Sequence, residues 1–99
     1  MKMYSNSSIL ANLFRGREAV GGKLYFDDEG MTFKSHALNI QTGDTRIEYK
    51  DITDVKPKNI YGLAPTGMLV STSDGTEYTF VVYHRKNVIA FLRERANLL

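Results

Sequence analysis

The fold class is decided by residues 21–35, which read Gly-Gly-Lys-Leu-Tyr-Phe-Asp-Asp-Glu-Gly-Met-Thr-Phe-Lys-Ser. Residues 23–26 and 31–34 each alternate polar and apolar side chains, which is the two-residue period of a half-buried β-strand. The four residues between them are turn formers, and we expect Gly30 to supply a positive φ at the reversal. The stretch therefore predicts a β-hairpin whose buried face carries Leu24, Phe26, Met31 and Phe33.

The segments before this hairpin are less regular. Residues 18–26 predict the first firm strand, and Gly21-Gly22 within it suggests a β-bulge or a bend. Residues 10–14 are mostly apolar but form too short a segment to define a helix, so we expect a turn or a short strand. Residues 1–8 are mainly polar and are interpreted as a loose N-terminal arm or as an arm that packs against another part of the chain.

The middle of the chain predicts two more strands. Residues 45–49 alternate again, and residues 50–52 are expected to form a tight corner. The next strand, residues 53–58, contains Pro57, which has no N–H for a sheet ladder, so this strand lies at an edge or ends there. Residues 59–67 contain two glycines and a proline and predict a loop.

The last third of the chain predicts a second hairpin and a helix. A Ser-Asp-Gly turn at residues 73–75 separates two β-rich runs, residues 68–72 and 76–82. The period then changes to that of a helix, with no proline or glycine to interrupt it, so residues 84–97 are expected to form a capping helix. Its predicted apolar face carries Val88, Phe91 and Leu92.

About seven strands followed by one amphipathic helix define a mainly β fold. A sheet with one apolar face must roll up or be covered by a second layer. We therefore expect a small curved barrel or a two-sheet sandwich, with the helix closing one open end. Ninety-nine residues suffice for one such core, so residues 1–99 are interpreted as a single domain.

Composition limits the classes of function. Thirteen Lys and Arg against eleven Asp and Glu give a net charge of +2, which is too small an excess to indicate a nucleic-acid partner. The absence of cysteine excludes disulfides and thiolate metal sites. No apolar run has the length of a membrane span, and the first residues do not form a signal peptide. We expect a cytoplasmic protein, peripheral at the inner membrane face if its ligand is a lipid.

Three segments resemble the motifs of GRAM domains. They are residues 21–35, residues 47–55, and residues 74–82 followed by the basic pair at 85–86. Their order and spacing over most of the chain are similar to those of the short, single-domain bacterial members of that family. The resemblance implies a pleckstrin-homology-like fold, a seven-stranded split barrel capped by a C-terminal helix. It also implies a binding role, because eukaryotic members attach to membrane lipids or to protein partners.

The sequence predicts no catalytic constellation. His36 and His84 have no carboxylate partner at strand or helix spacing, and there is no cysteine and no Gly-x-Ser-x-Gly elbow. The acidic run at residues 27–29 is interpreted as a solvated turn. We therefore expect no enzyme activity, no metal site and no cofactor.

Basic side chains cluster around the first hairpin. Because the start of one antiparallel strand lies beside the end of its hairpin partner, we expect Lys23, Lys34 and His36 to converge at one rim, where Arg15 and Arg17 could join them. Such a rim would bind a lipid headgroup phosphate or an acidic partner, at roughly 1 kcal/mol for each cation near an anionic leaflet. The alternative is ordinary solubilising charge.

The predicted loop at residues 60–65 carries three candidates for partner contact, Ile60, Tyr61 and Leu63. Apolar loops of this kind either fold back onto the core or lie at interfaces. The leading hypothesis is a non-catalytic binding module that recognises a protein surface or anionic lipid headgroups. The alternative is a homo-oligomeric structural protein that self-associates through this loop and an edge strand.

Overall fold

The computed structural model describes residues 3–36 and 43–98. Within them, seven antiparallel strands form one sheet in the order β4-β3-β2-β1-β7-β6-β5, and one α-helix follows the last strand. The elements are β1 (Ser8–Arg15), β2 (Glu18–Phe26), β3 (Gly30–Ser35), β4 (Asp44–Glu48), the 3-10 turn η1 (Tyr49–Asp51), β5 (Ile52–Ile60), β6 (Ala64–Thr72), β7 (Glu77–Val82) and α1 (Arg85–Arg95).

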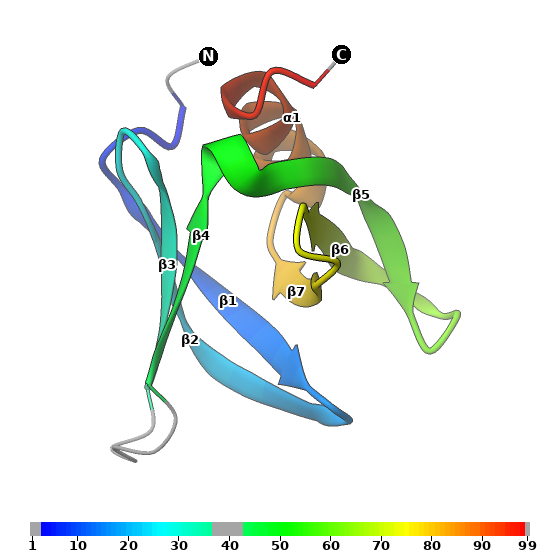
Figure 1. Cartoon of the computed structure of the whole chain (residues 1–99). Coiled ribbons are helices and arrows are strands. Elements are labelled where there is room, and N and C mark those ends of the chain that lie inside the picture. The colour runs from blue at the N-terminus through cyan, green and yellow to red at the C-terminus, as the bar shows by residue number, and fades with distance from the viewer. Residues whose placement is uncertain (1–2, 37–42, 99) are drawn as a thin grey trace.

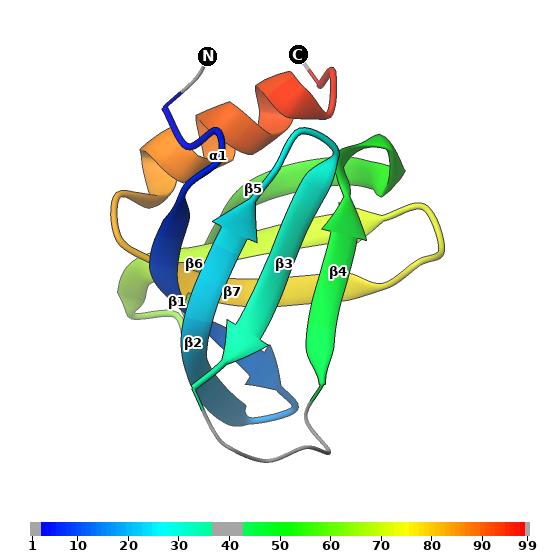
Figure 2. The same ribbon diagram turned by 90° about the vertical axis from the view of Figure 1, so that its left-hand side faces the viewer.

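The sheet is curled so that its two halves cross. Figure 2 shows β2, β3 and β4 in front of β5, β6 and β7, which run across them at a large angle. β1 joins the halves, because it pairs with β2 along its whole length and with β7 through residues 11–13. The helix α1 lies across one open end of the curl (Figure 1). The predicted seven-stranded, helix-capped β fold is confirmed.

The concave side of the curl holds the hydrophobic core. Alternate residues of the strands point into it, and α1 adds Val88, Phe91 and Leu92, which are fully buried. Burial of each such side chain contributes about 1.5–3 kcal/mol. The Phe91 ring packs edge-on against Phe26 and Tyr49, with centroids 5.3 and 6.3 Å away. The helix is therefore a part of the core as well as its cap.

The hairpin of β2 and β3 has the predicted inner face but a different role for Gly30. The four predicted side chains are buried and pair as Leu24 with Phe33 and Phe26 with Met31. The prediction of a positive φ was wrong, since Gly30 opens β3 without one. A side chain is excluded there for another reason: a Cβ would lie 2.4 Å from the carbonyl oxygen of Ile47 on β4.

The first two strands pair without interruption. Gly21-Gly22 suggested a bulge or a bend. There is no bulge in the pairing of β1 with β2, because the two strands keep one register over all eight residues of β1. Gly22 permits a close approach of β3, since a Cβ there would lie 2.2 Å from the Lys34 carbonyl oxygen. The segment at residues 10–14 is the middle of β1, a longer strand than expected, because it has hydrogen-bonded neighbours on both sides.

The residues before β1 pack against the helix-capped end of the core. The Tyr4 ring contacts Phe26 and Phe91, with centroids 5.7 and 5.5 Å away. The Phe26 N–H also donates to the carbonyl of Ser7 at 2.9 Å. Of the two alternatives for the N-terminal arm, residues 4–7 adopt the packed one, while residues 1 and 2 lie outside the described residues.

The loop predicted at residues 59–67 was wrong in extent, because only three residues separate β5 from β6. Tyr61 and Gly62 both have positive φ, 52° and 72°, which gives a tight reversal that matches the twist of the paired strands. The Leu63 N–H closes the turn by donating to the Ile60 carbonyl at 3.0 Å. The segment is therefore the tip of a long hairpin.

Both prolines lie where the sheet does not need their N–H. Pro57 is in β5, which forms one edge of the sheet as predicted. Pro65 is in β6 but precedes Gly67, where the pairing of β6 with β7 begins.

The remaining local predictions are confirmed. The corner at residues 50–52 is the η1 turn, and residues 73–75 lie in the turn between β6 and β7. The helix predicted at residues 84–97 extends over Arg85–Arg95, with His84 at its N-cap. No helix of the described chain has the length and apolar character that a membrane span requires.

Candidate functional site

The structure places three of the five predicted basic residues on the outer, convex side of the sheet. Lys23 on β2 lies directly opposite Lys34 on β3, and both alternate with core residues. His36 follows on the same side, where its N–H donates to the Gly21 carbonyl at 2.9 Å. The positive charge of Lys34 is partly neutralised by Asp44, because its Nζ lies 3.8 Å from Oδ2 of that residue.

The other two basic residues lie elsewhere. Arg15 ends β1 on the inner side of the curl, and its guanidinium donates to Oγ1 of Thr45 on β4 at 3.3 Å. Arg17 is in the β1–β2 turn and lines a small hollow together with Lys58 and Tyr61 of the β5–β6 hairpin. The structure thus divides the five residues among the outer face, the inner mouth of the curl and the neighbourhood of the hairpin tip.

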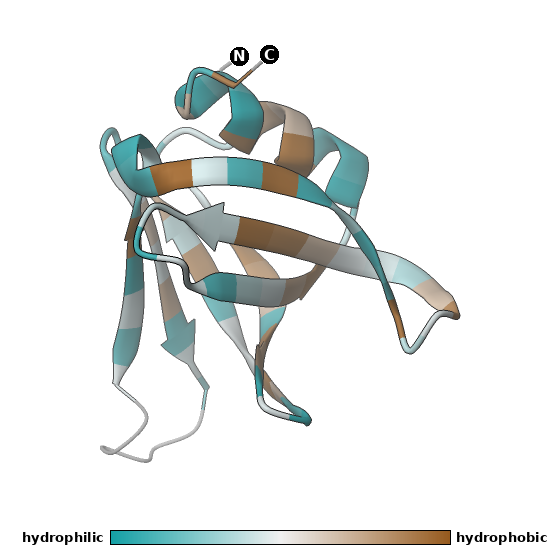
Figure 3. Ribbon diagram, turned by 45° about the vertical axis from the view of Figure 1, so that its right-hand side comes forward, coloured by the Kyte–Doolittle hydropathy of each residue, from teal (hydrophilic) through white to brown (hydrophobic). Residues whose placement is uncertain are grey.

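The tip of the β5–β6 hairpin exposes large apolar side chains. Leu63 is 85% exposed and Tyr61 is 77% exposed, whereas Ile60, the third residue predicted to contact a partner, is half-buried. The Tyr61 ring meets Phe14 of β1 edge-on at a centroid distance of 6.4 Å. Figure 3 shows hydrophobic residues at this end of the hairpin, which projects from the rest of the sheet.

The hairpin is also positively charged. The chain from Val55 to Thr72 contains Lys56 and Lys58 and no acidic residue. Lys58 donates from Nζ to the Thr79 hydroxyl at 3.4 Å and lies beside the exposed tip. The tip therefore combines protruding apolar side chains with nearby cations.

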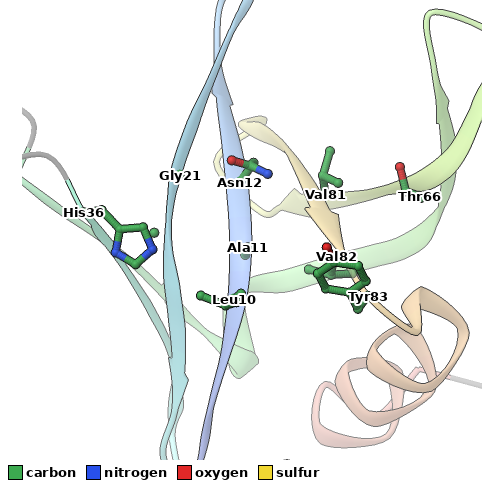
Figure 4. A pocket seen from close by; sticks show the side chains of 10 residues that line it. Leu10, Ala11, Asn12, Gly21, His36, Thr66, Val81, Val82 and Tyr83 are labelled. Atoms are coloured by element: carbon green, nitrogen blue, oxygen red, sulfur yellow. The ribbon is translucent and has the colours of Figure 1, made fainter.

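A groove of about 380 Å³ crosses the outer side of β2, β1 and β7 (Figure 4). It follows one row of paired positions in which Gly21 lies opposite Asn12 and Asn12 lies opposite Val81. Gly21 has no side chain to fill the row, so the backbone of β1 and β2 forms the floor. His36 lies at the β2 side of the groove in Figure 4.

The walls of this groove differ in chemistry. Leu10 and Tyr83, which are 53% and 77% exposed, form an apolar wall, while Thr66 adds a hydroxyl. Lys23 lies directly opposite Leu10 in the β1–β2 pairing, so the apolar wall continues into the outer-face cations. No acidic residue is among those that line the groove.

No pattern in the sequence predicts this groove. It depends on the pairing of β1 with β7, which come from opposite ends of the chain. The one local signal was Gly21, a residue without a side chain in an otherwise regular strand.

The β2–β3 turn, by contrast, is a compensated polar network. The Asp27 carboxylate accepts the N–H groups of Glu29 and Gly30 at 2.9 and 3.0 Å, and Arg46 donates to both of its oxygens. The hydrogen bonds from Arg46 and Glu29 hold the pKa of the Asp27 carboxyl well below its usual range. Burial raises the pKa of Tyr49 to about 12, and its hydroxyl donates to the Asp27 carbonyl at 3.0 Å.

The histidines do not form a common site. His36 follows β3, whereas His84 precedes α1. In residues 3–36 and 43–98 no three His, Cys, Asp or Glu side chains are grouped so that they could hold a metal ion.

Comparison with known proteins gives structural matches alone. No family model matches the chain, and no curated protein matches it significantly. The C-terminal domain of an unknown protein from Leishmania infantum superposes with a TM-score of 0.77 at 17% identity, over 92% of this chain and 82% of that one. The DH/PH domains of p115-RhoGEF give 0.71 at 12% identity, over 95% of this chain and 30% of that one. The Slm1-PH domain in complex with phosphoserine gives 0.62 at 8% identity, over 90% of both chains.

The chain has a pleckstrin-homology-like fold. At these identities the matches describe the fold and do not transfer a ligand.

Proposed function

We propose that this protein is a non-catalytic module that binds an anionic membrane surface through the tip of the β5–β6 hairpin. The observation that carries the proposal is the exposure of Tyr61 and Leu63 on a projecting turn, within a stretch from Val55 to Thr72 that contains no acidic residue. At a membrane interface, apolar side chains enter the boundary of the acyl region while cations stay with the phosphates. Membership of the GRAM family is part of this proposal.

The tip is held in place before any ligand arrives. Arg85 donates from Nη1 to the Gly67 carbonyl at 3.1 Å and to the Lys58 carbonyl at 3.3 Å, which ties both strands of the hairpin to the start of α1. On the other side Tyr61 rests against Phe14. A surface that is already ordered loses little conformational entropy on binding.

The cations near the tip provide the electrostatic part of the binding. Arg17 and Lys58 line the same hollow as Tyr61, and each cation near an anionic leaflet contributes roughly 1 kcal/mol. Salt screens such exposed charges. Binding should therefore weaken as the salt concentration rises.

Co-sedimentation with vesicles tests the apolar tip. Wild-type protein should sediment with vesicles of phosphatidylcholine and phosphatidylserine and remain in solution with phosphatidylcholine alone. Leu63→Ser should weaken the binding about fivefold, which corresponds to about 1 kcal/mol. Tyr83→Ser is the control, because it removes another large and mostly exposed side chain from a different surface. Equal binding by Leu63→Ser and wild type would contradict the proposal, as would a wild-type protein that does not bind the anionic vesicles.

Charge reversal tests which cations act. Arg17→Glu and Lys58→Glu should each reduce vesicle binding at low salt, whereas Lys23→Glu and Lys34→Glu on the outer face should not. The opposite result would place the membrane contact at the rim around Lys23 and Lys34 and exclude the hairpin tip.

Self-association through β5 is the competing function. The free edge of β5 carries Lys56, Pro57 and Lys58, and both like charges and a missing N–H oppose strand addition at an edge. We therefore expect a monomer at all concentrations in light scattering. A dimer that Lys56→Ser strengthens would favour assembly through this edge.

A further inference from the structure

The outer-face groove joins an apolar wall to a basic surface. Tyr83 and Leu10 form one side, and the row that contains Leu10 continues through Lys23 to Lys34. His36 adds an imidazole at the β2 end of the groove (Figure 4). An occupant must therefore match apolar surface at one end and positive charge at the other.

The shape of the groove favours a polypeptide segment. Its floor is backbone at Gly21, which is recessed between side-chain walls, so the flat surface of a bilayer cannot reach it. The volume of about 380 Å³ is in the range that holds a few side chains. Asn12 presents an amide and Thr66 a hydroxyl, which are groups that can bond the backbone of an extended peptide.

We propose that this groove binds an extended segment of a partner protein in which an apolar side chain is followed by acidic residues. The apolar side chain lies against Leu10, Val81 and Tyr83, on the β1–β7 side of the groove. The acidic residues lie over Lys23 and His36, where complementary charge fixes the direction of the segment. This site is separate from the hairpin tip, so one protein can bind a membrane and a partner at the same time.

Selection from a fully randomised phage-displayed peptide library tests the proposal without knowledge of the natural partner. The enriched peptides should combine an aromatic or aliphatic residue with nearby Asp or Glu. In NMR titrations with the best peptide, the amide signals of Leu10, Asn12, Gly21 and Val81 should shift, and those of the outer turns of α1 should not.

Substitutions in the groove provide the decisive comparison. Gly21→Val fills the floor, and its Cβ would lie 3.3 Å from Oδ1 of Asn12 and 3.8 Å from the His36 ring. It should weaken the selected peptide about tenfold or more, as loss of a central contact does. Tyr83→Ser, which alters an exposed side chain and does not threaten folding, should weaken it as well. Lys23→Glu should weaken it most at low salt.

Leu63→Ser is the matched control, because it should weaken vesicle binding and leave peptide binding unchanged. Failure of the hairpin tip and failure of the groove are therefore separately visible. The groove proposal is overturned if no peptide is enriched, if the enriched peptides lack acidic residues, or if folded Gly21→Val and Tyr83→Ser bind them as wild type does. It is also overturned if light scattering shows a dimer that Tyr83→Ser converts to a monomer, because a second copy of the chain then occupies the groove.

Discussion

Two hairpin turns of this protein reverse the chain equally tightly, but they differ in how the rest of the molecule holds them. The β2–β3 turn at residues 27–29 is bound by Arg46 from β4 and by the Tyr49 hydroxyl from η1. The β5–β6 turn is closed by one hydrogen bond from Leu63 to Ile60, and its apolar side chains face solvent.

The comparison shows that chemistry alone does not identify a binding surface. The β2–β3 turn has three consecutive acids, yet Asp27 is engaged by its own backbone and by Arg46. The β5–β6 turn contains no charged residue, but the side chains of Tyr61 and Leu63 are exposed, so a ligand can contact them. A segment can bind another molecule only with groups that the fold has not already used.

The largest effect is expected beneath the β2–β3 turn. Phe91→Ala removes the ring that packs against Phe26 and Tyr49. We expect a loss of about 3–5 kcal/mol in the free energy of unfolding, measured by urea denaturation. Asn87→Ala on the exposed face of α1 is the control and should change it little. A small loss for Phe91→Ala would mean that the helix is not a part of the core.

Glycine substitutions compare the two hairpins directly. Gly30→Ala would place a Cβ 2.4 Å from the Ile47 carbonyl oxygen, so it should cost about 3 kcal/mol or more. Gly62→Ala meets no atom within 4 Å and has only its φ of 72° to oppose it, which costs about 1 kcal/mol. Thermal melts of the two variants should show this order, and equal melting temperatures would contradict it.

Acid should weaken the β2–β3 turn specifically. Because the pKa of Asp27 is lower in the folded protein than in the unfolded chain, its stabilising effect is complete above the ordinary carboxyl range and is lost as the pH falls. The pair with Arg46 is half-exposed, so the effect should be no more than about 1 kcal/mol. Asp27→Asn should therefore lose less stability than wild type between neutral pH and pH values below the carboxyl range. If Asp27→Asn and wild type lost the same stability over this pH range, the Asp27 carboxylate would not stabilise the fold as described.

The smallest effect on stability is expected at the β5–β6 tip. Leu63 is 85% exposed, so Leu63→Ser should change the free energy of unfolding by less than about 0.5 kcal/mol. The same variant should lose most of its vesicle binding. A clear loss of stability would instead assign Leu63 a structural role.

The local pattern was sufficient for much of the fold. Alternation identified the inner faces of β2 and β3, and the change of period identified α1, because both signals lie within a few neighbouring residues. The extent of the β5–β6 hairpin was underestimated, since Tyr61 adopts a positive φ that its residue type rarely takes. Gly30 lies in the hairpin as predicted, but the predicted reason for a glycine at this position was wrong. A glycine is needed because β4 approaches closely, and not because of a positive φ.

The sequence by itself determined the buried faces of the β2–β3 hairpin and of α1, because burial there follows the local period of strand and helix. Only the tertiary structure decided which surface groups are neighbours. It separated Arg15 and Arg17 from Lys23 and brought Asn12 beside Val81 from the other end of the chain. The physical reason is that the curl of a sheet and the pairing of distant strands are fixed by long-range contacts, which leave no local period in the sequence.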